Sequence, residues 1–239
     1  MKRLELWVTV AALGAACTTM AFASDKDSKH SRNAEKRVSD ATEVYQQLVN
    51  APDRGVPQGL VEKCKCVAVF PGVLKAAIGY GARHGTGVMS CRQGNGNWTP
   101  PAFLKITGGS AGFQIGATST DLVLFFMSDR GARSLINGSK LTLGGKASVA
   151  AGPLGRSAEM ATNLELKSEI YSYARSKGLF AGLSVEGARI SPDQDEETAY
   201  YGHSVTPREL LFGNPSISVP QSADAFRSAL ESESRAGSE

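Results

Sequence analysis

The spacing of apolar residues predicts a helix near the start of the chain. From residue 34 onward, apolar side chains recur every three or four residues, which is the period of an amphipathic helix. The positions are Ala34, Val38, Ala41, Tyr45 and Leu48. Pro52 follows directly and cannot continue a helix, so we expect the helix to end near residue 50. A second, short helix is predicted around residues 58–63.

Beyond residue 65 the pattern changes to short apolar runs separated by glycine, which is typical of strands and tight turns. The run 66–70 is followed by Pro71-Gly72, where we expect the first strand to end. Further strands are predicted over residues 74–82, 85–92, 102–107, 112–117 and 121–127. Several of them are interrupted by glycine.

The last third combines short helices with one more pair of strands. A helix over residues 129–136 follows Ser128, a good N-cap residue, and strands are predicted over 169–176 and 179–190. Thr206-Pro207-Arg208-Glu209 has the form of a capping box and opens a helix through Phe212. The predicted fold class is therefore α+β, with a mainly antiparallel Gly-rich β-sheet core, an N-terminal amphipathic helix and short peripheral helices.

The first residues have the pattern of a secretory signal peptide, with a basic start, an apolar stretch and then small residues. Two positions for the end of the signal peptide are compatible with the sequence. Ala21-Phe22-Ala23 forms a cleavage site before Ser24, whereas Leu13–Cys17 resembles a lipobox in which Cys17 would be lipidated. Both alternatives predict an exported protein, either in the periplasm or associated with the outer membrane.

An exported protein lies in an oxidising compartment, so its cysteines can form disulfides. After the signal peptide, Cys64, Cys66 and Cys91 remain. Cys66 and Cys91 lie in two apolar strand runs, and we expect them to form a disulfide across neighbouring strands. The alternative is a zinc site that adds Cys64 and His84, but the paired C-x-x-C spacing of such sites is missing. No metal is predicted.

Composition and charge narrow the functional classes. With 239 residues, 41% hydrophobic and 21% charged, the chain is neither collagen-like nor wholly disordered. Residues 60–156 carry eleven Lys and Arg but three acidic residues, a net charge of +8. Residues 157–239 carry seven basic and thirteen acidic residues, a net charge of −6. The basic block favours an anionic partner, unless the acidic last third folds over it.

Catalytic motifs are weak. Gly108–Gly112 matches G-x-S-x-G around Ser110, with His203 downstream, but a nucleophile elbow needs a helix directly after the serine. The following residues alternate like a strand, so a serine esterase is the remote alternative. Gly144-Gly145-Lys146 fails as a P-loop. The chain is predicted not to be an enzyme and to need no cofactor. No predicted helix carries the basic stripe of a nucleic-acid recognition helix, so a nucleic acid is not expected as a partner.

Several longer motifs occur in a fixed order along the chain. They are residues 67–73 (VAVFPGV), 79–88 (GYGARHGTGV), 98–103 (WTPPAF), 107–116 (TGGSAGFQIG), 151–156 (AGPLGR), 171–182 (YSYARSKGLFAG) and 199–202 (AYYG). Together they resemble the SYLF domain family. On this basis the chain divides into a signal peptide (1–23), a disordered linker (24–33), a SYLF-like domain (34–213) and an acidic Ser-rich tail (214–239). Within the tail, Ser222 is an N-cap candidate for one weak helix through Phe226 and Leu230.

The resemblance implies a non-enzymatic protein that binds membranes rich in anionic phospholipids or phosphoinositides. Eukaryotic members also bind actin filaments, but the export signal argues against cytoplasmic actin as the native partner here. The other prediction left open is a structural envelope protein that binds a protein partner.

Basic side chains on a rigid Gly-rich sheet are suited to phosphate oxygens, because they make charge-assisted hydrogen bonds. Arg83 and Arg156 lie beside glycines of the motifs and are the leading candidates. The remaining candidates are Lys63, Lys65, Lys75, Arg92, Lys105, Arg130 and Arg133.

Overall fold

The structure of the chain is a computed structural model. It describes residues 28–51, 55–137, 140–145, 147–153, 168–176, 179–182, 185–213 and 217–235. The predicted signal peptide, with Cys17, lies outside the described residues, as do residues 24–27 of the predicted linker.

The described strands form one seven-stranded sheet. They are β1 (Cys66–Cys91), β2 (Ala102–Phe126), β3 (Leu141–Thr142), β4 (Val149–Ala151), β5 (Ile170–Ser176), β6 (Leu179–Gly182) and β7 (Arg189–Pro192). The order is β3-β7-β2-β5-β4, with β1 also paired to β2 and β6 to β5. Because β4 and β5 run parallel while the other described pairs are antiparallel, the sheet is mixed. This refines the predicted α+β fold.

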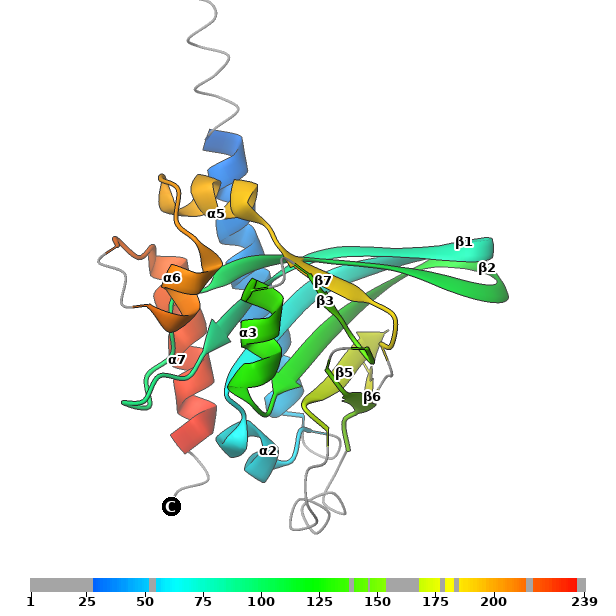
Figure 1. Cartoon of the computed structure of the whole chain (residues 1–239), viewed down its shortest axis with the longest axis horizontal. Helices are drawn as coiled ribbons and strands as arrows, with labels where there is room; N and C mark the ends of the chain where they lie inside the picture. The colour runs from blue at the N-terminus through cyan, green and yellow to red at the C-terminus, as the bar shows by residue number, and fades with distance from the viewer. Residues whose placement is uncertain are drawn as a thin grey trace, which may run out of the picture.

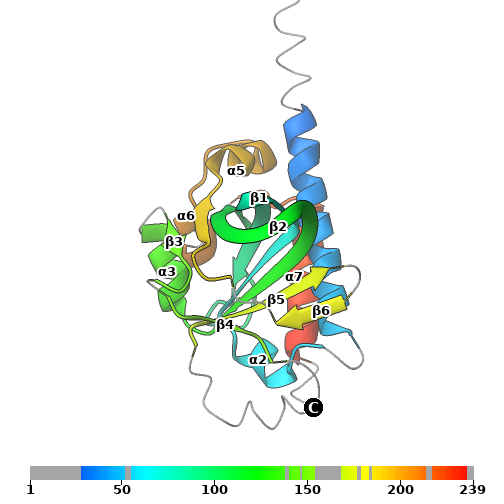
Figure 2. The ribbon, with the colours of Figure 1, turned by 90° about the vertical axis from the view of Figure 1, so that its right-hand side faces the viewer.

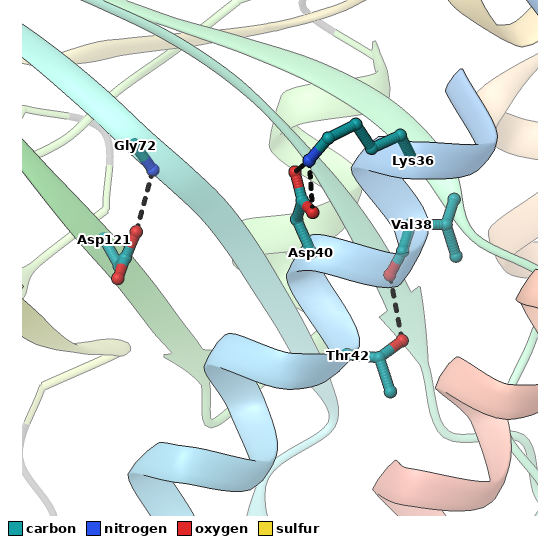
Figure 3. A network of polar contacts seen from close by, with 6 residues as sticks. All are labelled: Lys36, Val38, Asp40, Thr42, Gly72 and Asp121. Atoms are coloured by element: carbon teal, nitrogen blue, oxygen red, sulfur yellow. Dashed lines mark hydrogen bonds and ion pairs between the residues drawn. The ribbon is translucent and has the colours of Figure 1, made fainter. Parts of the chain in front are cut away.

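Two strands dominate the sheet, and we call the pair β1–β2 the ribbon. Its register runs from Cys66 opposite Phe126 to Met89 opposite Ala102. The predicted break at Pro71-Gly72 is wrong, because these two residues form a bulge opposite Asp121 and the strand continues. Gly72 has a φ of 61°, and its N–H donates to Asp121 Oδ1 at 2.9 Å in place of a ladder bond (Figure 3).

The ribbon also folds back on itself. At the bend, between the pairs Ile78–Ile115 and Tyr80–Ala111, the register shifts so that Gly79 faces the three residues 112–114. Figures 1 and 2 show the ribbon projecting from the body and curling over at this bend. The two halves of β1 approach so closely that a Cβ atom on Gly87 would lie 2.2 Å from the carbonyl oxygen of Val69.

The two ends of β1 meet at the base of the ribbon. Arg92 N–H donates to the Lys65 carbonyl at 2.7 Å, and the first and last residues of the strand, Cys66 and Cys91, form a disulfide of 2.08 Å. Cys64 is the free cysteine of the described part, and burial raises the pKa of its thiol to about 12. The zinc site considered as the alternative would need the thiolates of Cys66 and Cys91, which the disulfide occupies. No metal-binding cluster occurs among the described residues.

The N-terminal helix covers residues 28–49 and starts earlier than predicted, since residues 28–33 are helical. Its apolar stripe is fully buried, with an exposed fraction of 0% at Ala34, Val38, Ala41, Tyr45 and Leu48. The Tyr45 ring lies 6.4 Å from that of Phe125 on β2. On the outer face, Lys36 and Asp40 form an ion pair of 2.7 Å (Figure 3). The stripe thus belongs to the core.

Shorter helices gather on the side of the sheet opposite the bend (Figure 1). They are α2 (Gln58–Lys63), α3 (Asp129–Asn137), α5 (Gln194–Tyr201), α6 (Pro207–Phe212) and α7 (Gln221–Arg235). The capping box predicted at Thr206 and Glu209 is confirmed. None of the helices within the described ranges combines the length and apolar character needed to cross a bilayer.

The C-terminal boundary of the fold differs from the prediction. Residues 221–235, which we assigned to an acidic tail, form α7 and bury Ala223, Phe226 and Leu230 in the core. Arg227 Nε also donates to the carbonyl of Trp98 at 2.8 Å. The polar composition hides an apolar stripe with helical spacing, and that stripe docks the segment.

Candidate functional site

A small cavity lies between the two halves of the folded ribbon, and we call it the ribbon cavity. Its volume is about 100 Å³, and its lining comprises Val73, Lys75, Arg83, Thr118, Thr120, Leu122 and Val185. Lys75 comes from the outgoing half of β1 and Arg83 from the returning half. The site therefore exists because the ribbon bends.

Strand register explains the composition of the lining. Val73 pairs with Thr120 and Lys75 with Thr118, and directly opposed residues of antiparallel strands share a face. The outgoing half of the ribbon thus contributes one lysine and two threonines to the lining. The threonines were not identified from the sequence, because nothing local shows that their strand faces Lys75.

The electrostatics of the cavity favour an anion. Arg83 is half-buried, and desolvation lowers the pKa of its guanidinium, which nevertheless stays charged because the ordinary pKa of arginine is so high. None of the described residues that line the cavity is acidic. A partly desolvated cation without a carboxylate beside it is unfavourable, and a bound anion would relieve that cost.

Two of the other predicted residues are paired with acidic side chains of the last third of the chain. Lys105 Nζ lies 2.9 Å from Asp193 Oδ1, and Arg130 lies 3.8 Å from Glu169. At these two positions, acidic side chains of residues 157–239 cover basic side chains of residues 60–156. This is the alternative to an exposed basic surface that the charge pattern left open.

Two further predicted residues lie over aromatic rings. The Arg92 guanidinium is 5.0 Å from the Trp98 ring centroid and donates to the Val61 carbonyl at 3.2 Å. The Arg133 guanidinium is 4.4 Å from the ring of Phe212. These contacts give both residues a role in packing.

The remaining predicted residues lie apart from the cavity. Lys63 is exposed at the end of α2, and Lys65 is exposed just before β1. Arg156, one of the two leading candidates, lies outside the described residues. Of the nine predicted positions, the structure thus brings Lys75 and Arg83 together at one cavity.

The backbone around Ser110 does not form a nucleophile elbow. Residues 108–112 all lie within β2, and Ser110 is paired with Gly81 of β1. An elbow requires a sharp strand-to-helix turn at the serine. The geometry on which the esterase alternative depends is therefore missing.

A larger cavity of about 580 Å³ lies between α3, α5 and α6, and no sequence pattern predicts it. Its lining mixes charges of both signs and includes Lys105, Asp195 and Arg208, the last of which donates to Asn137 Oδ1. The mixed charge makes this cavity a poorer match for a polyanion than the ribbon cavity.

Comparison with known proteins agrees with this picture of a binding domain. Residues 107–233 match the family described as "Ysc84: Las17-binding protein actin regulator". A rat protein named "SH3 domain-containing YSC84-like protein 1" is 35% identical over 194 residues, which is 81% of this chain and 55% of the relative. "Protein YSC84" of Saccharomyces cerevisiae is 37% identical over 191 residues, 79% of this chain and 40% of the relative.

A third similar protein is "LAS seventeen-binding protein 3" of the same yeast species, 34% identical over 194 residues, covering 80% of this chain and 42% of the relative. The name of this third protein states an interaction with another protein. This chain belongs to the Ysc84 family, which is the SYLF domain family indicated by its sequence motifs. The chain spans about half the length of the curated relatives it matches.

Proposed function

We propose that this protein binds anionic phospholipid or phosphoinositide headgroups at a membrane surface, and that the ribbon cavity holds the phosphate. The single observation that carries the proposal is that Lys75 and Arg83 line the same cavity, where no lining residue within the described part of the chain is acidic. Ammonium, guanidinium and threonine hydroxyl groups all donate hydrogen bonds, and phosphate oxygens accept them.

The charge of the surrounding sequence supports the same partner. Residues 63–120 contain no Asp or Glu, so the ribbon presents cations without local carboxylates up to Asp121. Each Lys or Arg near an anionic membrane contributes about 1 kcal/mol of attraction. Two cations at one cavity therefore give weak, salt-sensitive binding, and other exposed basic residues add to it.

The proposed location is the cell envelope. The signal-peptide pattern supports export, and a disulfide between Cys66 and Cys91 is stable in an oxidising compartment. Lipidation of Cys17 would add a membrane anchor, whereas cleavage before Ser24 would release a protein held by its headgroup contacts. N-terminal analysis of the mature protein distinguishes the two.

Vesicle sedimentation tests the proposal. The purified protein is mixed with phosphatidylcholine vesicles, with and without phosphatidylserine or a phosphoinositide, over a range of salt concentrations. We expect binding to anionic vesicles that weakens with salt, and a loss of about fivefold in partitioning for Lys75→Gln or Arg83→Gln, corresponding to about 1 kcal/mol each.

Lys36→Gln is the matched control, because Lys36 is an exposed cation on the N-terminal helix and is not one of the described residues that line the ribbon cavity. It should leave partitioning within about twofold of the parent protein. Equal binding to zwitterionic and anionic vesicles would contradict the proposal, and so would an effect of Lys36→Gln as large as that of Arg83→Gln.

The family description favours a second candidate function, the binding of a protein partner. The matching family is described as Las17-binding and actin-regulating, and those words apply to the relatives. If this chain shares that kind of activity, it should sediment with a protein filament or co-purify with an envelope protein while ignoring lipid vesicles. Sedimentation with purified actin filaments tests whether this chain binds a protein filament.

A further inference from the structure

The bend of the ribbon has a composition unlike the rest of the surface. It comprises residues 76–82 of β1 and 106–120 of β2, and neither segment contains a charged residue. The backbone register places Ile78 opposite Ile115 at the bend, and Phe113 is the middle residue of the three that face Gly79. Large apolar residue types are therefore concentrated where the ribbon turns back.

The bend projects from the body of the protein. In Figures 1 and 2 the helices lie at one end of the ribbon and the bend extends beyond the sheet at the other. Leu74, two residues before this segment, has an exposed fraction of 58%, which is unusual for a large apolar side chain in a protein with a substantial core.

Cations flank the bend on both sides. Lys75 directly precedes the uncharged segment of β1, and Arg83 directly follows it. At about 3.3 Å per strand residue, Gly79 lies about 13 Å along the chain from Lys75. The tip of the bend thus lies beyond the two cations along the ribbon.

We propose that the bend of the ribbon enters the interfacial layer of an anionic bilayer, with Lys75 and Arg83 at the level of the phosphates. This inference rests on the proposed function and adds the element that penetrates the membrane. Charge selects the occupant: residues 63–120 contain no Asp or Glu, and two cations flank the bend, so this part of the ribbon is complementary to an anionic surface. Apolar residue types at the bend match the acyl boundary below it.

The backbone limits how deep the bend goes. A two-stranded ribbon has two open edges whose N–H and C=O groups have no strand partner, and such edges do not occur in the hydrocarbon core. Interfacial segments bury their apolar face by about 5–10 Å, where water still reaches the backbone. The bend therefore lies at the boundary between headgroups and acyl chains.

The N-terminal helix is the other amphipathic element, and the structure gives its apolar stripe a different role. Val38, Tyr45 and Leu48 have an exposed fraction of 0% in the core. Insertion of this helix into a bilayer would require it to leave the sheet and expose the core. The bend needs no such rearrangement.

A tryptophan placed at the bend tests the inference. Phe113→Trp is made in the full chain with Trp7→Phe, which leaves Trp98, with an exposed fraction of 1%, as an inaccessible reference. The protein is mixed with vesicles of phosphatidylcholine and phosphatidylserine that carry a nitroxide either near the headgroup or deep in the acyl chain. Asn95→Trp, at the exposed turn at the other end of β1, is the control.

We expect the fluorescence of Phe113→Trp to shift to the blue on vesicle binding and to be quenched more by the shallow nitroxide than by the deep one. Asn95→Trp should show neither change. If Phe113→Trp does not fold, as judged by circular dichroism, Tyr80→Trp on the other strand of the bend is used.

The outcomes separate the two proposals. Sedimentation with anionic vesicles but no quenching at the bend overturns insertion and leaves headgroup binding intact. Failure to sediment at all overturns both. A blue shift that appears without vesicles and grows with protein concentration would show that the bend contacts a second copy of the chain, and it would also overturn insertion.

Discussion

At Gly87 the fold of the ribbon depends on the absence of a side chain. A Cβ atom there would lie 2.2 Å from the carbonyl oxygen of Val69 and 2.6 Å from the Phe70 ring. We therefore expect Gly87→Ala to lower the free energy of unfolding by about 3 kcal/mol, the upper range for overpacking. Urea denaturation measures the change. Gly94→Ala is the control, because a Cβ there has no neighbour within 4 Å, and an equal loss in both variants would refute the steric explanation.

A single carboxyl group also makes stability depend on pH. Glu197 has an exposed fraction of 0%, and its Oε1 accepts a hydrogen bond from Phe103 N–H at 3.1 Å. Desolvation raises the pKa of Glu197 from 4.5 to about 8. The folded protein therefore holds this proton more tightly than the unfolded chain, so the free energy of unfolding falls as the pH rises through this window.

Glu197→Gln removes the titrating group and keeps a side-chain oxygen to accept the bond. Between pH 5 and pH 8 the parent protein should lose roughly 3 kcal/mol of stability relative to Glu197→Gln. Urea unfolding at the two pH values gives the difference. Glu43→Gln, at an exposed position, should change stability by less than about 0.5 kcal/mol at both. Parallel pH profiles for the parent and Glu197→Gln would contradict the assignment.

At the scale of elements, Asp121 joins three strands. Its Oδ1 accepts from Gly72 N–H at the bulge of β1, and its Oδ2 lies 2.6 Å from Arg175 of β5 (Figure 3 shows the first contact). We expect Asp121→Ala to cost about 2 kcal/mol in unfolding free energy, because it leaves a partly buried guanidinium and a backbone N–H without this partner.

Asp40→Ala is a matched control for that experiment. Asp40 also pairs with a basic side chain, Lys36, but the Lys36 side chain is largely exposed and that of Asp40 is partly exposed. Such surface pairs contribute less than about 0.5 kcal/mol. The two aspartates appear together in Figure 3. Similar losses for both variants would show that the bulge does not depend on Asp121.

Elements with a strong local signal could be predicted, and elements fixed by distant contacts could not. The helix over residues 34–48 follows from its own spacing, and the helix at Thr206 follows from its capping box. The continuity of β1 through Pro71-Gly72 does not, because the bulge is held by a side chain 49 residues further along. Glycine and proline normally end strands, so the sequence predicted short strands where the ribbon is continuous.

At the scale of the whole molecule, the charge pattern was informative but incomplete. It identified Lys75 and Arg83, and it correctly raised the question of cover by acidic residues, which Lys105 and Arg130 answer by pairing with Asp193 and Glu169. The cavity itself could not be predicted, because it forms only when the ribbon folds back and brings Arg83 to Thr118. Docking of α7 was missed for a similar reason: its buried partners lie in other elements.

The bond between Cys66 and Cys91 makes β1 a closed covalent ring that contains the outgoing and returning halves of that strand. A protease that cuts β1 once near its projecting bend would therefore open the ring without releasing a fragment. After such a nick, the chain should migrate as one piece on a denaturing gel without thiol and separate into two pieces once dithiothreitol is added. The projecting end of the ribbon is in this way protected against loss by a single cleavage of β1.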